Sequence, residues 1–160
     1  MSVAPFVQTT FEVARMMIQA AEMKSGEVLY DLGCGDGRLV IIAAKDFGVK
    51  AIGIELREDL CERARAEIKR LNLEAKVTIV QADLFQIPIS DADVITCYLT
   101  PVMMESLRPK LENELKSGAR VISHDFEIPG WKASAVHLHE YKTQGWPPET
   151  IYVYKIGQQI

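Results

Sequence analysis

Three glycines at alternate positions directly follow a short apolar run, and this stretch is the first part of the chain that could hold a ligand. The run spans residues 28–32 and contains Asp31, and the glycines are Gly33, Gly35 and Gly37. Glycine lets the backbone adopt a positive φ and lets a ligand approach without a Cβ in the way. A helical pattern of apolar residues begins after Gly37, so the free N–H groups of a helix start should face the turn. The pattern predicts a buried strand, a tight ligand-binding turn and a helix.

The spacing of these glycines separates two kinds of nucleoside ligand. A dinucleotide site has the spacing G-x-G-x-x-G, but Arg38 stands where the third glycine would be. The observed spacing, D-x-G-x-G-x-G, resembles motif I of the class I S-adenosylmethionine-dependent methyltransferases, whose loop packs against the amino-acid end of the cofactor. The resemblance assigns five residues to cofactor binding, namely Asp31, Gly33, Cys34, Gly35 and Gly37. A purely structural turn in another α/β protein is the alternative for this stretch alone.

A second acid stands at the end of the next apolar run. Residues 51–54 are apolar, and Glu55 follows them, 20 positions after Gly35. A carboxylate at the tip of a strand can accept hydrogen bonds from both hydroxyls of a ribose. NAD sites share this feature, so Glu55 supports a nucleoside ligand without choosing which one. The alternative is an exposed acid at the start of a helix.

The residues that follow the later strands should complete the site, because ligands of parallel sheets bind at the carboxyl ends of the strands. After the third predicted strand, Asp83 would accept a hydrogen bond from the adenine amino group, while Leu84 and Phe85 would flank the ring. A helix cap or a loop acid is the alternative for Asp83. After the fourth strand, residues 97–101 read CYLTP and place Tyr98 at the site. Amino methyltransferases that act on nucleobases or glutamine amides carry Asn/Asp-Pro-Pro-aromatic there, so that class is disfavoured.

Nearly the whole chain is similar to the small protein-lysine methyltransferases, above all the archaeal broad-specificity kind. It is also similar to the enzymes that methylate the c subunit of mitochondrial ATP synthase. The similarity is carried by residues 30–38, 107–112 and 118–131, and residues 9–12 resemble the N-terminal segment of the seven-strand histone-lysine methyltransferases. The resemblance implies S-adenosylmethionine as cofactor, with Thr9 across its methionine end and Tyr98 beside it. It implies lysine side chains of proteins as acceptors, with broad specificity.

Methyl transfer needs alignment of the acceptor more than a strong protein nucleophile, because the methyl group is already activated by a sulfonium. Accordingly the sequence contains no Ser/His/Asp triad and no metal-ligand spacing. A lysine must be neutral to attack, and a poorly hydrated aromatic channel lowers its pKa. Tyr98, Phe126 and Trp131 are the candidates for the walls of such a channel, where cation–π contact could first attract the ammonium. Core packing of Phe126 and a loop-anchoring role of Trp131 are the alternatives, and His124 and Asp125 either order the cofactor pocket or bond the backbone.

Composition narrows the remaining alternatives, which are a small-molecule methyltransferase, an RNA methyltransferase and a non-catalytic cofactor-binding adaptor. The net charge is −4 with no basic patch, which argues against a nucleic-acid partner. The intact glycine turn and Glu55 argue against a silent adaptor. Hydrophobic residues make up 48% of the chain, yet no apolar run reaches the about 18 residues that a bilayer requires. Residues 1–5 do not resemble a signal peptide, and three cysteines without paired spacing indicate reduced thiols and a cytoplasmic protein.

The elements that position these residues follow from apolar periodicity. Strands are predicted at about 28–32, 51–55, 76–80, 92–98, 119–123, 135–141 and 150–156. Helices are predicted at about 9–23, 38–48, 58–71 and 102–115, after an extended lead-in at 5–8. Thr9 should cap the first helix, with Glu12 completing a capping box. Pro109 should break the last helix near Arg108 and start a second short one.

The order of these elements predicts an α/β fold in one domain, residues 1–160. Five β–α units are followed by two strands with no helix between them, which is the layout of the methyltransferases. That resemblance implies a Rossmann-like, doubly wound seven-stranded sheet in the order 3-2-1-4-5-7-6, with only strand 7 antiparallel. The last strand is apolar on both faces, as an interior strand should be. NAD-binding domains end instead in another parallel unit.

Overall fold

The computed structural model describes residues 9–160, so the predicted extended lead-in at 5–8 and the residues 1–5 lie outside the described part of the chain. Helices and strands alternate along the chain and end in a pair of strands. In order they are α1 (Phe11–Ala20), β1 (Val28–Leu32), α2 (Arg38–Phe47), β2 (Lys50–Glu55), α3 (Glu58–Arg70), β3 (Val77–Gln81), β4 (Val94–Cys97), α4 (Pro101–Glu114), β5 (Arg120–His124), β6 (Ala135–His139) and β7 (Glu149–Lys155).

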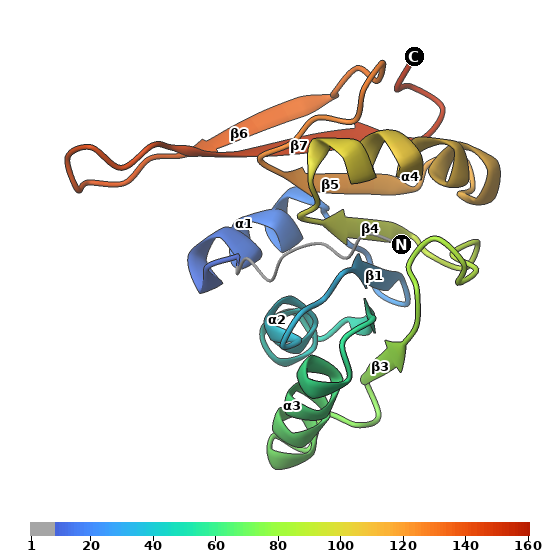
Figure 1. Cartoon of the computed structure of the whole chain (residues 1–160), viewed down its shortest axis with the longest axis vertical. Helices are drawn as coiled ribbons and strands as arrows, with labels where there is room; N and C mark the ends of the chain where they lie inside the picture. The colour runs from blue at the N-terminus through green and yellow to red at the C-terminus, as the bar shows by residue number, and fades with distance from the viewer. Residues whose placement is uncertain (1–8) are drawn as a thin grey trace.

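All seven of these strands form one sheet in the order β3-β2-β1-β4-β5-β7-β6 (Figure 1). β7 runs antiparallel to both β5 and β6, and the other neighbouring pairs are parallel. The predicted order and the interior position of the last strand are therefore confirmed. In the parallel register Leu32 stands beside Ile54 and Cys97, and Cys97 stands beside Ser123. The carboxyl ends of β2, β1, β4 and β5 consequently meet at one edge of the sheet.

Helices cover the sheet on both faces because alternate strand residues point to opposite sides. Leu29 packs into a cluster with buried residues of α1, α2 and α3, whereas its neighbour Tyr30 packs into a second cluster with α4. On β7 the same alternation sends Val153 to the first cluster and Tyr154 to the second. Figure 1 shows α1 and α4 on opposite sides of β5. Among residues 9–160, no helix combines the length and the apolar character that crossing a membrane would demand.

The prediction that Thr9 caps the first helix is wrong. Thr10 is the N-cap, and its hydroxyl accepts a hydrogen bond from the N–H of Val13 at 3.3 Å. The Thr9 hydroxyl is engaged elsewhere, 3.0 Å from a ring nitrogen of His124. The helix also ends at Ala20, before the predicted end at residue 23. It cannot continue because Glu22 has a left-handed φ of 47°, and Arg120 of β5 donates hydrogen bonds to the carbonyl oxygens of residues 21 and 22 just beyond the helix end.

The predicted break near Arg108 is also wrong, since α4 runs without interruption through Pro109. Leu107 and Leu111 are both fully buried on either side of the proline, so packing of this face stabilises the continuous helix. Pro109 cannot donate a hydrogen bond to the carbonyl of Glu105. Glu105 is exposed, so water can satisfy that carbonyl and the loss is tolerated.

Candidate cofactor and acceptor site

The glycine turn after β1 requires glycine for its backbone conformation. Gly33, Gly35 and Gly37 have φ values of 77°, 58° and 83°, in the left-handed region that other residues rarely adopt. The N–H groups of Gly33 and Cys34 both donate to the carbonyl oxygen of Ile54, at 2.8 and 2.9 Å. These bonds fasten the turn to the end of β2.

Two of the glycines also lie where the packing is close. A Cβ added to Gly37 would lie 2.8 Å from the Cβ of Ala64, so this glycine lets α3 approach the start of α2. A Cβ on Gly33 would lie 3.3 Å from the side chain of Leu99. Gly53 of β2, which sequence reasoning missed, has the same role toward the turn, because a Cβ there would come within 2.6 Å of the Cys34 sulfur.

Glu55 is held beside the turn, as the sequence predicts. One of its carboxylate oxygens accepts a hydrogen bond from the N–H of Gly35 at 2.9 Å, and the other accepts one from the N–H of Arg57 at 2.9 Å. Each carboxylate oxygen can accept a second hydrogen bond. The half-buried carboxylate is therefore fixed at the tip of β2 with lone pairs left for a ligand.

Asp31 lies next to the same turn and is almost completely buried. The hydroxyl of Thr96 on β4 donates a hydrogen bond to Asp31 at 2.9 Å. Burial raises the pKa of Asp31 to about 7, the Thr96 hydrogen bond opposes that rise, and the charge of Glu55 adds to it. Burial, together with the charge of Asp31, also raises the pKa of the Cys34 thiol. Sequence reasoning missed Thr96, although the register that pairs it with Asp31 would have identified it.

The loop after β3 carries the residues predicted to contact adenine. Asp83 accepts a hydrogen bond from the N–H of Phe85 at 3.0 Å through one carboxylate oxygen. The loop-acid role considered for Asp83 is therefore present in the structure, and the second oxygen has no protein partner among the described residues. Leu84 is buried in the cluster on the α4 side of the sheet, with Phe85 packed partly against it.

The ends of β4 and β5 bring aromatic rings together. The ring of Tyr98 lies 3.9 Å from the ring of His124 and 6.2 Å from the ring of Phe126, measured between centroids. Burial raises the pKa of the Tyr98 phenol, and the negative charges of Asp125 and Glu149 raise it further. The phenol is therefore neutral at ordinary pH. Tyr98 and Phe126, both predicted to wall an acceptor channel, form one stacked pair.

Trp131 lies in a different environment. Its indole N–H donates to the carboxylate of Glu112 on α4 at 2.8 Å, and its ring packs edge-on against Tyr154 at 5.6 Å. Only 9% of the side chain is exposed. Among residues 9–160, no ring contact joins Trp131 to Tyr98 or Phe126. These contacts match the loop-anchoring alternative, in which Trp131 fastens the segment after β5 to α4.

His124 connects the aromatic pair to two other parts of the fold. The side chain is fully buried, and its Nδ1 and Nε2 atoms each lie 3.0 Å from an oxygen, one on Thr9 and one on Glu149. Burial lowers the pKa of His124, while the carboxylates of Asp125 and Glu149 oppose that shift. Asp125 itself has a φ of 64° and accepts a hydrogen bond from the N–H of Thr150 at 2.9 Å. His124 therefore forms hydrogen bonds with side chains, and Asp125 forms one with the backbone.

The side chains of His124, Asp125 and Glu149 also bring ligand-type atoms within 4.8 Å of one another. The hydrogen bond between His124 and Glu149 accounts for much of this proximity.

Comparison with known proteins identifies the chain. Residues 31–135 match the family model described as the ANTKMT methyltransferase domain. A protein-lysine N-methyltransferase from Saccharolobus islandicus is 43% identical over 155 residues, which cover 96% of this chain and 94% of that protein. The chain belongs to the protein-lysine N-methyltransferase family. Its cofactor is S-adenosylmethionine, and the predicted class I methyltransferase fold and enzyme class are confirmed.

Other relatives of this methyltransferase differ in length and in stated substrate. The Mus musculus lysine N-methyltransferase for the c subunit of ATP synthase is 35% identical over 127 residues, which cover 79% of this chain but only 51% of that protein. This chain therefore spans about half the length of that relative. A crystal structure of an RNA methyltransferase from Salinibacter ruber, in complex with S-adenosyl-L-homocysteine, has a TM-score of 0.86 and 38% identity, with 96% of each chain covered.

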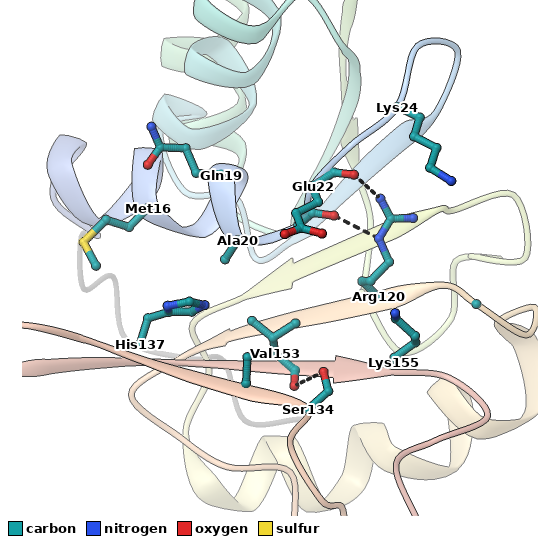
Figure 2. Close-up of a pocket in the computed structure, with 13 residues that line it drawn as sticks. Met16, Gln19, Ala20, Glu22, Lys24, Arg120, Ser134, His137, Val153 and Lys155 are labelled. Carbon is teal, nitrogen blue, oxygen red and sulfur yellow. Dashed lines mark hydrogen bonds between the residues drawn. The ribbon is translucent and has the colours of Figure 1, made fainter.

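The methyltransferase also has a cavity of about 660 Å³ that is remote from this site (Figure 2). It lies between α1 and the strands β6 and β7, and its walls include Arg120 and Lys155. Arg120 begins β5 and pairs with Lys155 at the end of the antiparallel β7. The cavity therefore opens at the amino ends of the parallel strands, at the opposite edge of the sheet from the glycine turn and Tyr98. This cavity is therefore separate from the residues that the sequence predicts to bind cofactor and acceptor.

Proposed function

We propose that this methyltransferase methylates lysine side chains in flexible segments of proteins, with broad specificity. The observation that carries the proposal is the stacked pair of Tyr98 and Phe126, which stands at the same sheet edge as the glycine turn and Glu55. A chain that is 43% identical over nearly its full length is a protein-lysine N-methyltransferase. With no added substrate-binding element among residues 9–160, the acceptor site would be open to an exposed protein segment.

The cofactor would lie along the carboxyl ends of β1, β2 and β3. Glu55 would accept hydrogen bonds from the ribose hydroxyls, and the free oxygen of Asp83 would accept one from the adenine amino group, with Leu84 beside the ring. The glycine turn, with Asp31 and Cys34 beneath it, would pack against the amino-acid end. Thr9 would lie across that same end. When bound, the cofactor supplies a methyl group on a positively charged sulfur.

The acceptor would approach alongside the stacked rings of Tyr98 and Phe126. Its amine must lose a proton before it can attack, and desolvation against the rings favours the neutral amine. The carboxylates of Asp125 and Glu149, which already act on Tyr98, attract the cationic form from solution. The two effects on the lysine pKa oppose each other. Attraction by the carboxylates raises the pKa and would help to capture the cation, whereas desolvation lowers the pKa and would favour the neutral amine. Trp131 would contribute by holding the segment after β5 in place, outside the channel.

RNA is the second candidate acceptor, because the relative from Salinibacter ruber is an RNA methyltransferase. The net charge of −4 argues against it, since RNA binding depends on lysines and arginines that neutralise phosphates. A small amine as acceptor and a non-catalytic adaptor remain as outcomes of the test. A cytoplasmic location is consistent with the three cysteines, all of which are buried and free.

The test is incubation of the enzyme with labelled S-adenosylmethionine and a mixture of protein extract and total RNA. The Glu55→Ala variant serves as the control for background transfer. We expect label in protein, on lysine by mass spectrometry, in several different proteins. Label in RNA or in small amines, with none on lysine, would overturn the proposal, and label in one protein alone would overturn broad specificity.

A further inference from the structure

We propose that Glu149, acting through the buried ring of His124, positions two groups of the site at once. One group is the Thr9 hydroxyl, which it turns into a pure hydrogen-bond acceptor facing the cofactor, and the other is the ring of Tyr98. His124 and Glu149 are thus positioning residues, and neither needs to touch the reacting atoms. This inference rests on the proposed placement of cofactor and acceptor at the carboxyl ends of the strands.

The hydrogen-bond chain crosses three separate parts of the fold. Glu149 begins β7, His124 ends β5, and Thr9 precedes α1. The two bonds of His124, to Glu149 and to Thr9, are both 3.0 Å long. Because the His124 ring is fully buried, water cannot replace either partner. The chain therefore fixes the position of the segment before α1 relative to the end of the sheet.

The direction of the hydrogen bonds follows from the chemistry of the groups. The carboxylate of Glu149 faces a ring nitrogen of His124, and a carboxylate accepts a hydrogen bond and does not donate one. Nε2 of His124 consequently carries the proton. Burial lowers the pKa of His124, so the ring is neutral near pH 7, and Nδ1 is an acceptor. The hydroxyl of Thr9 must then donate its only proton to Nδ1, and only its lone pairs remain for a ligand.

A hydroxyl that can only accept selects a ligand group that donates. At the methionine end of the cofactor, the α-ammonium is such a group and the carboxylate is not. The backbone carbonyl of Thr9 is fixed independently, by a 3.2 Å hydrogen bond from Arg38 at the start of α2. Thr9 is thus held between the glycine turn and the end of β5, over the edge of the sheet where the amino-acid end of the cofactor is placed.

The same ring supports Tyr98 from one side. Its centroid lies 3.9 Å from that of Tyr98, and Phe126 stacks on Tyr98 at 6.2 Å. Glu149 in addition accepts a hydrogen bond from the hydroxyl of Tyr141 in the β6–β7 connection. Loss of the Glu149 carboxylate should therefore loosen the cofactor-facing Thr9 and the acceptor-facing Tyr98 together.

A double-mutant cycle tests the hydrogen bond between His124 and Thr9. Calorimetry measures the Kd of purified enzyme for S-adenosyl-L-homocysteine. Thr9→Val removes the hydroxyl at nearly constant shape, and His124→Phe keeps a ring against Tyr98 while removing both hydrogen bonds. We expect each variant to raise the Kd about tenfold, and the double variant to be no worse than either alone, because both break one chain. Thr9→Ser should restore wild-type affinity. His137→Phe is the control, since His137 lines the cavity between α1 and β7 at the opposite edge of the sheet from Thr9 and Tyr98.

The pH dependence of the Kd separates this role from simple packing. Protonation of His124 puts a second proton on Nδ1, so Thr9 must turn and present a donor to the ligand. The groups facing His124 are Thr9, Tyr98, Asp125 and Glu149, and the two carboxylates oppose the effect of burial on its pKa. Because burial lowers the pKa of His124, we expect wild-type affinity to weaken only at acidic pH, and His124→Phe to lack that step.

Two results would overturn the inference: losses that add in the double variant, or single variants that bind like wild type. If His124→Phe does not fold, Glu149→Leu replaces it in the cycle with the same expectation. The readout is independent of the acceptor. Should wild-type enzyme fail to methylate lysine, the proposed function fails while the binding cycle can still be interpreted, and an additive cycle leaves lysine methylation untouched.

Discussion

Replacement of Glu55 by alanine separates a ligand-binding carboxylate from one that only holds a turn. In the structure its two oxygens accept hydrogen bonds from the N–H groups of Gly35 and Arg57. Loss of two such bonds costs about 2 kcal/mol of stability at about 1 kcal/mol each. For a chain of this length that lowers the Tm by about 4–8 °C. This is the effect expected if Glu55 does nothing more than hold the turn.

A carboxylate that also binds the ribose has a much larger effect on affinity. Two charge-assisted hydrogen bonds contribute about 1.5–3 kcal/mol each, so Glu55→Ala should raise the Kd for S-adenosyl-L-homocysteine about 10²–10⁴-fold. Calorimetry gives the Kd, and a thermal melt gives the Tm of the same sample. Glu55→Gln keeps an acceptor oxygen, so its Kd should lie between that of the wild type and that of Glu55→Ala. Glu58→Ala, which removes an exposed acid in the first turn of α3, is the control and should bind normally.

The result that refutes this reasoning is a Glu55→Ala variant whose Tm falls as described while its Kd stays within about threefold of wild type. The carboxylate would then be a structural partner of the glycine turn, and the ribose would have to bind elsewhere.

Substitutions at four further positions test other parts of the site. Gly35→Val should abolish cofactor binding in a folded protein, because φ at this position is 58° and a β-branched residue is strained there; calorimetry and circular dichroism check it, and normal affinity would place the ligand elsewhere. Tyr98→Ala should lower kcat far more than cofactor affinity, whereas Tyr98→Phe should retain most activity; equal turnover in all three enzymes would remove the acceptor role. The pKa of Asp31 is raised from 3.8 to about 7, so the stability that the protonated carboxyl contributes is lost as the pH rises between those two values. The free energy of unfolding of Asp31→Asn should therefore depend less on pH and should exceed that of the wild type by up to about 4 kcal/mol at pH 8. Denaturant titrations check this, and the same pH profile in both proteins would contradict it. Trp131→Phe should lower the Tm by about 2–4 °C through loss of one hydrogen bond and leave kcat unchanged. A large loss of kcat at an unchanged Tm would indicate instead that Trp131 contacts the acceptor.

The parts of the site that sequence reasoning located are those whose signals are local. The glycines and Glu55 are recognisable by their positions directly after apolar strands. The parallel register then brings Gly35 and Glu55 into contact across 20 residues. The sheet order came from the resemblance of the element order to the methyltransferase layout, and the apolar character of β7 on both faces agreed with the interior position that this layout implies.

The parts that were missed or misassigned depend on contacts between distant segments. Thr9 and Thr10 are equally good caps by type, and only the long-range bond to His124 shows that Thr10 takes that role. Proline usually ends or kinks a helix, but at Pro109 the tertiary packing of Leu107 and Leu111 outweighs that preference. Glu149 begins a strand far along the chain, and nothing about its neighbours indicates that it reaches the buried ring of His124.

Transfer of a methyl group to the lysine amine of a protein segment can be measured directly with peptides. The reaction contains a flexible peptide with one lysine, a matched peptide with arginine in its place, and an RNA, and it is analysed by tandem mass spectrometry between pH 7 and pH 9. We predict methylation on the lysine amine alone, at a rate that still rises above pH 8, because an unperturbed lysine has a pKa of about 10.4 and only its neutral form attacks. Methyl groups on the RNA or on both peptides equally, with none specific to lysine, would contradict lysine methylation as the activity of this enzyme.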